Sequence, residues 1–154
     1  MRLDSAVSIP VINMPDLLKG KLIFIANETL TYTEAKLFEI CLEALAEKMV
    51  EDKIDISSLT HLNVLFTKSG SYSMTEESGD RFGFHLNLSI YALDNLRKTN
   101  SDRFMVVTFI EELVHHFWQV EDETKTKYKT LEIAQKIVPG ITLELLKEWH
   151  VNGI

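Results

Sequence analysis

The sequence has little of several residue types that small proteins use to hold covalent or membrane-bound structures. Its 154 residues include a single cysteine, Cys41, so no disulfide can form within the chain. A lone cysteine suits a reducing compartment, and the first residues lack the apolar segment of a signal peptide. We therefore expect a cytoplasmic protein. Because no apolar run approaches the roughly 20 residues that cross a bilayer, we expect no membrane association.

Positive charge is also in deficit. The chain has 16 Lys and Arg against 23 Asp and Glu, which gives a net charge of −7. Proteins that bind nucleic acids usually concentrate Lys and Arg on one face, so this balance predicts no nucleic-acid partner. The glycines at 70, 79 and 83 match no phosphate-binding spacing, which leaves nucleotide binding without support.

Apolar residues make up 45% of the chain, and its length is typical of one compact domain, here 1–154. Short apolar runs and one alternating segment predict strands at 21–26, 62–67 and 82–90. Periods of three and four predict helices from a cap at Thr31 to about Val50, at 103–120, at 130–137, and from Thr142 to about Trp149, with a charged linker at 121–129. The predicted fold is α+β, a small mixed β-sheet of about three strands packed with four helices.

The alternating segment has two different faces. Its apolar residues point one way and its polar residues the other, which is typical of a half-buried strand. The apolar set is Phe82, Phe84, Leu86, Leu88 and Ile90, and the polar set is Gly83, His85, Asn87 and Ser89. We expect the polar face to line a groove.

The helix predicted at 103–120 carries two overlapping pairs of polar residues, Glu111 with His115 and Glu112 with His116. Residues four apart lie one above the other on a helix. At about 100° per residue from Ile110 in the core, Glu111 and His115 flank the buried stripe and could reach one ion. Glu112 lies beside them, where a carboxylate can activate a metal-bound water.

This pattern resembles the zincin metallopeptidase signature, His-Glu-x-x-His on a helix, with Glu111 in the place of the first histidine. The resemblance implies a zinc ion or another divalent metal, with Glu111 and His115 as ligands and Glu112 as the general base. A carboxylate can ligate zinc at about 2.0–2.2 Å, and it makes the site more tolerant of other metals. The zincin resemblance also implies that the strand predicted at 82–90 is an edge strand that holds an extended peptide substrate.

The third ligand has several candidates. One zincin branch takes it from a following helix, which implies Glu132. Asp122 and its two neighbours, Glu121 and Glu123, are the alternatives, because they follow His115 closely in a dense acidic segment.

Two functional interpretations remain open on the sequence. In the first, the chain is a divergent zincin-like, metal-dependent hydrolase that acts on peptides. In the second, the same Glu and His residues are a solvated helix face of a non-catalytic domain that binds a peptide or protein partner. The sequence does not indicate an oligomeric state.

Overall fold

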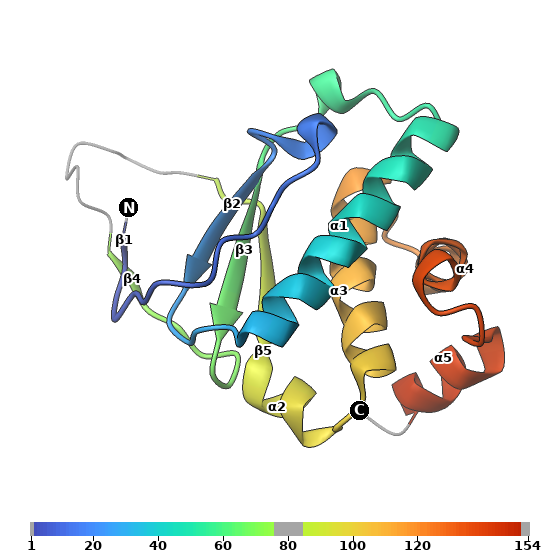
Figure 1. The fold of residues 1–154 in the computed structure, drawn as a ribbon. Helices are drawn as coiled ribbons and strands as arrows, with labels where there is room; N and C mark the ends of the chain where they lie inside the picture. The colour runs from blue at the N-terminus through green and yellow to red at the C-terminus, as the bar shows by residue number, and fades with distance from the viewer. Residues whose placement is uncertain (1, 76–84, 152–154) are drawn as a thin grey trace.

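The computed structural model describes residues 2–75 and 85–151, and side chains up to residue 149. It has the predicted α+β class, with both parallel and antiparallel strand pairs (Figure 1). The strands are β1 (Arg2–Leu3), β2 (Leu22–Ala26), β3 (Leu62–Thr67), β4 (Met74–Thr75) and β5 (Leu88–Ala92). The α-helices are α1 (Tyr32–Glu51), α2 (Leu93–Lys98), α3 (Asp102–Phe117), α4 (Glu123–Ile137) and α5 (Leu143–Val151); two 3-10 turns lie at Asp16–Leu18 and Ile56–Ser58.

The main sheet has three parallel strands in the order β2-β3-β5, and β1 and β4 form a separate antiparallel pair. Helix α1 connects β2 to β3, the crossover that two parallel strands require. Helices α1 and α3 lie beside the sheet, α4 packs on both of them, and α5 packs on α4 (Figure 1). This layering places α3 between the edge strand β5 and the outer helices.

The elements predicted from local signals are confirmed closely. Strand β3 has its predicted bounds, and all six of its residues are buried because it lies in the middle of the sheet. Helix α1 begins where the capping box at Thr31 predicts. The Thr31 side chain accepts from the Glu34 amide, and the Glu34 carboxylate accepts from the Thr31 amide.

The edge strand differs from the prediction. Strand β5 covers only Leu88–Ala92, and residues 85–87 are not in a strand. The predicted positions 82–84 lie outside the described residues. The buried face is the opposite one, because Ser89 and Tyr91 are buried whereas Leu88 and Ile90 are half-buried. Tyr91 points into the core, where its hydroxyl donates to the backbone oxygen of Phe109 at 2.7 Å.

The helices on the C-terminal side also differ from the prediction. Helix α3 ends at Phe117, not Val120, and Gln119 has a left-handed φ of 52° that turns the chain. Helix α4 begins at Glu123, within the segment predicted as a linker, because the Asp122 side chain caps it by accepting from the Lys125 amide. Helix α2, a fifth helix where four were expected, follows β5 directly.

None of the helices within the described parts of the chain combines the length and apolar character that crossing a membrane requires.

Candidate functional site

Three of the predicted site residues, Glu111, Glu112 and His115, lie on the last turns of α3. The predicted apolar stripe of this helix is buried at Val106, Ile110, Leu113 and Phe117, whereas its last member, Val120, is half-buried and follows the helix. Burial of this stripe fixes the rotation of α3, so that its polar residues come to the rim of the core. The four site side chains there, Glu111, Glu112, His115 and His116, are all half-buried.

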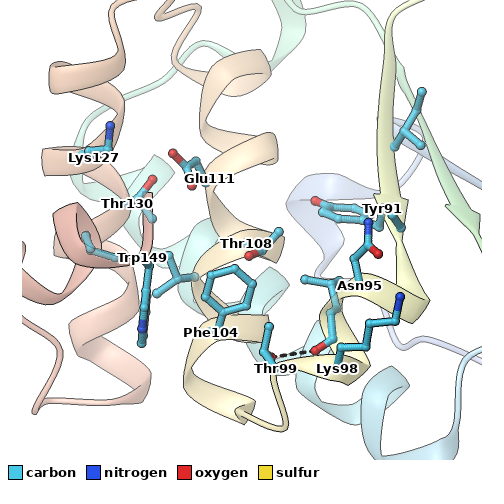
Figure 2. Close-up of a pocket in the computed structure, with 15 residues that line it drawn as sticks. Tyr91, Asn95, Lys98, Thr99, Phe104, Thr108, Glu111, Lys127, Thr130 and Trp149 are labelled. Atoms are coloured by element: carbon cyan, nitrogen blue, oxygen red, sulfur yellow. Dashed lines mark hydrogen bonds between the residues drawn. The ribbon is translucent and has the colours of Figure 1, made fainter. Parts of the chain in front are cut away.

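These side chains line two different hollows, which lie at different heights along α3. Glu111 lines a cavity of about 690 Å³ between β5, α2, α3, α4 and α5 (Figure 2). Glu112, His115 and His116 line a groove of about 530 Å³ that also includes Glu121 and four residues around the start of β5. The four are Leu86, Asn87, Leu88 and Ser89. Glu111 and His115, predicted as ligands of one ion, therefore line different hollows.

His115 is oriented by the turn that follows α3. Its Nδ1 lies 2.7 Å from the carbonyl oxygen of Val120, and because a carbonyl only accepts, this nitrogen carries the proton. In neutral His115, the lone pair is then on Nε2. That atom lies 3.8 Å from a carboxylate oxygen of Glu123. His115 therefore presents a hydrogen-bond acceptor or ligand atom toward Glu123, which was one of the alternative third ligands.

Glu112 is a half-buried carboxylate among other charged side chains. Burial raises its pKa, the neighbouring His115 acts to lower it, and the negative charges of Glu111 and Glu123 raise it further. A carboxylate with a raised pKa exchanges protons more readily near neutral pH, which is the property that a general base needs.

This burial predicts a gain in stability for Glu112→Gln. Since the folded pKa of Glu112 is raised, its ionised form is disfavoured in the folded state at pH values above the pKa. We expect the variant to have a higher melting temperature than the parent at pH 8, and the difference to shrink at pH 4, below the pKa of about 4.3 of an unperturbed glutamate. Thermal unfolding followed by circular dichroism at the two pH values measures this. A variant less stable than the parent at pH 8 contradicts it.

His116 has a separate role. Its Nε2 lies 3.0 Å from the carbonyl oxygen of Thr60 and donates to it, which links α3 to the loop before β3. Burial lowers the pKa of His116, while the Thr60 carbonyl acts to raise it. This histidine is held by the fold with its Nε2 occupied.

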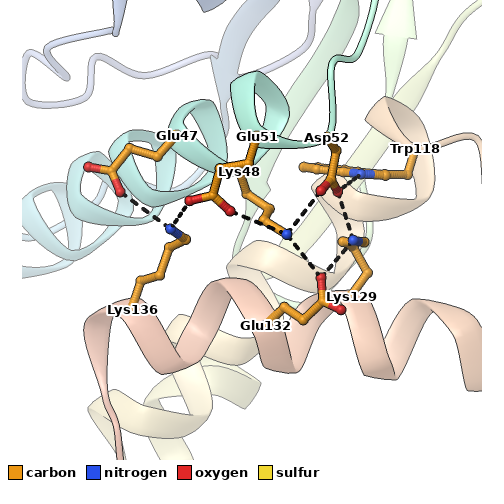
Figure 3. A network of polar contacts seen from close by, with 8 residues as sticks. All are labelled: Glu47, Lys48, Glu51, Asp52, Trp118, Lys129, Glu132 and Lys136. Carbon is orange, nitrogen blue, oxygen red and sulfur yellow. Dashed lines mark hydrogen bonds and ion pairs between the residues drawn. The ribbon is translucent and has the colours of Figure 1, made fainter.

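Glu132 lies in a network of charges between α1 and α4 (Figure 3). Its carboxylate is 2.6 Å from the ammonium of Lys129 and 3.4 Å from that of Lys48. Both lysines also bind Asp52, which accepts from the indole of Trp118. Burial acts to raise the pKa of Asp52, but hydrogen bonds from Lys129 and Lys48 lower it to about 2. The structure thus places Glu132 in a helix-to-helix network and not beside His115.

The metal predicted by the resemblance does not fit the described side chains. Within residues 2–75 and 85–149, no three His, Cys, Asp or Glu side chains converge in a way that could hold an ion. Glu111, His115 and Glu132 in particular are not brought together as a group.

The large cavity was not anticipated. Lys127 and Thr130 line it from α4, but Lys127 fell in the predicted linker. The Asp122 cap starts α4 about two turns before the predicted start at residue 130. Recognising this cap in the sequence would have placed Lys127 and Thr130 on one helix.

No protein-family model, curated protein or solved structure matches the chain.

Proposed function

We propose that the chain is a divergent zincin-like domain that binds an extended, basic peptide segment of a partner in the groove between β5 and α3. The observation that carries the proposal is the position of this groove. It lies at the start of β5, a strand at the edge of the main sheet, and Leu62 at the start of β3 lines it together with Glu112 and Glu121.

The edge strand supplies the backbone part of this binding. Strand β5 pairs with β3 on one side, and no other strand in the described part of the chain pairs with its second side. An unpaired strand edge presents alternating N–H and C=O groups that can add a further strand. Such binding gives affinity through the backbone and leaves specificity to the side chains around the groove.

Charge supplies the specificity. Glu112 and Glu121 line the groove and Glu123 lies beside His115, so the surroundings are acidic within a chain of net charge −7. Lys or Arg side chains of a bound strand would face these carboxylates, and complementary charge raises both the association rate and the selectivity.

A metal-dependent hydrolase is the second candidate. The specific observation in its favour is the lone pair on His115 Nε2, which faces Glu123, with the raised pKa of Glu112 nearby. We rank it second because the described side chains offer no third ligand.

The test uses two fluorescein-labelled octapeptides, alternating Lys-Val and alternating Glu-Val. We expect the basic peptide to bind and the acidic one not to bind, as measured by fluorescence anisotropy. Glu121→Lys reverses an exposed charge in the groove and should weaken binding severalfold, since an exposed ion pair contributes up to about 1 kcal/mol and the reversal replaces attraction with repulsion. Glu144→Lys makes the same change on the exposed surface of α5 and should have little effect.

Two further measurements separate the candidates. A basic peptide with proline at alternate positions lacks the backbone donors for strand addition, and we expect it not to bind. Equal losses in the two charge-reversal variants would overturn the groove proposal. A melting temperature raised by zinc in the parent, and unchanged in His115→Ala and Glu123→Ala, would favour the hydrolase candidate instead.

A further inference from the structure

The cavity lined by Glu111 has both apolar and polar walls. Tyr91 closes it on the strand side, Phe104 and Thr108 line it from α3, and Trp149 lines it from α5 (Figure 2). The Phe104 and Trp149 rings pack edge to face with their centroids 5.3 Å apart. Its volume of about 690 Å³ is within the roughly 300–1,000 Å³ of small-molecule sites.

Thr130 carries an unsatisfied polar group into this cavity. Its residue is only 1% exposed, and its Oγ1 has no hydrogen-bond partner among the described residues. Thr126, one turn earlier on α4 and also buried, is different, because its Oγ1 donates to the carbonyl oxygen of Asp122 at 3.0 Å. Buried hydroxyls normally find a partner, so the state of Thr130 points to a partner that comes from outside the chain.

The polar groups near Thr130 define the chemistry of that partner. Thr130 and Glu111 project from α4 and α3 into the same corner of the cavity (Figure 2). An ammonium group has three donors and no acceptor, which matches a corner made of a hydroxyl and a carboxylate. A carboxylate has about four acceptor positions, so Glu111 can accept from an ammonium in addition to any other contact.

We propose that this cavity binds a small primary amine with an aromatic body. The ammonium lies in the corner formed by Thr130 and Glu111, and the ring lies against Phe104 and Trp149. This site is separate from the peptide groove, because the two hollows share no lining residue.

Three probes with the same ring and different charges test the proposal: 2-naphthylmethylamine, 2-naphthamide and 2-naphthoate. Binding is measured by NMR titration of the tryptophan indole N–H resonances. The chain has two tryptophans, and Trp118 is an internal control because it lies in the charge network and not in the cavity. We expect the amine to shift the Trp149 resonance, to leave that of Trp118 in place, and to bind at least about tenfold more tightly than the amide.

Lys98 and Lys127 also line the cavity, and their positive charges would favour an anionic ligand over an amine. If they determined the ligand, the naphthoate would bind most tightly, and the proposal would be overturned. Equal affinity for the three probes, or no shift of Trp149 with any of them, would also overturn it. Glu111→Gln should lower the affinity for the amine at least about tenfold and leave the affinity for the amide unchanged.

A matched pair of threonine variants separates ligand binding from folding. Thr130→Val removes a hydroxyl without a partner, so we expect a higher melting temperature together with weaker amine binding. Thr126→Val removes a hydroxyl that donates to Asp122, so we expect a lower melting temperature and unchanged amine binding. Amine affinity unaffected by Thr130→Val would contradict the proposed site.

Discussion

Replacing Arg97 with methionine is expected to destabilise the protein by roughly 3 kcal/mol at pH 7. Arg97 binds Glu34 through two hydrogen bonds of 2.8 and 2.9 Å, and it also binds Glu28 at 3.0 Å and the carbonyl of Thr29 at 2.9 Å. Glu34 is 7% exposed, so the variant leaves a buried carboxylate without its cation. Breaking a buried pair in this way costs about 3–5 kcal/mol. We expect the lower end because the Arg97 side chain is 29% exposed.

The pH dependence follows from the pKa of Glu34. Hydrogen bonding to Arg97 holds this pKa below its usual range, against burial, which acts to raise it. A group with a depressed folded pKa contributes stability above its unfolded pKa, about 4.3 for glutamate, and loses it as the pH falls through the folded pKa. The difference between parent and Arg97→Met should therefore narrow below about pH 4. Urea denaturation at pH 7 and at several acidic pH values measures it.

Glu34→Gln provides the control for this pair. The double variant Glu34→Gln/Arg97→Met has no buried charge left, so its loss should be smaller than the sum of the two single losses. Additive losses, or an Arg97→Met variant as stable as the parent at pH 7, would show that the pair contributes little.

The contacts of Arg97 also show which part of the fold could not be predicted from the sequence. It lies on α2, the helix that the sequence did not predict, and it is 63 residues from Glu34. The local part of the same cluster was predictable, because Thr31 and Glu34 lie three residues apart and form a capping box by themselves. Local signals therefore located the start of α1, but they contained nothing about the arginine that neutralises its carboxylate.

The same distinction explains the outcome at the candidate site. The period of the buried residues placed Glu111, Glu112 and His115 on the correct helix and at the rim of its core. Their division between two hollows depends on β5 and α5, which contact α3 only in the folded chain. Glu132 was predicted beside a metal from the zincin resemblance, whereas the structure pairs it with two lysines. One of them, Lys48, is 84 residues away, on α1.

The largest loss of stability is expected for Phe38→Ala. Phe38 is fully buried on α1, at the centre of a cluster of rings from all three strands of the main sheet and from α3. Its ring centroid lies 4.9–5.9 Å from those of the other four members, Phe24, Phe66, Tyr91 and Phe109. Truncating such a residue removes contacts in every layer at once and leaves a cavity that rigid strands and helices cannot close. Phe-to-Ala changes in cores cost about 3–5 kcal/mol.

Two matched variants show whether the loss comes from this position. Phe38→Leu keeps most of the volume and should lose far less, on the order of 1 kcal/mol, because near volume-conserving changes usually cost less than about 1.5 kcal/mol. Ile40→Ala truncates a side chain on the same helix that is 42% exposed and should lose still less. Urea denaturation followed by far-ultraviolet circular dichroism ranks the three. Because domains are stable by only about 5–15 kcal/mol, Phe38→Ala should show a clearly lower urea midpoint or a partly unfolded native baseline. A midpoint for Phe38→Ala as high as that for Ile40→Ala would mean that the ring cluster does not hold the sheet to α1 and α3.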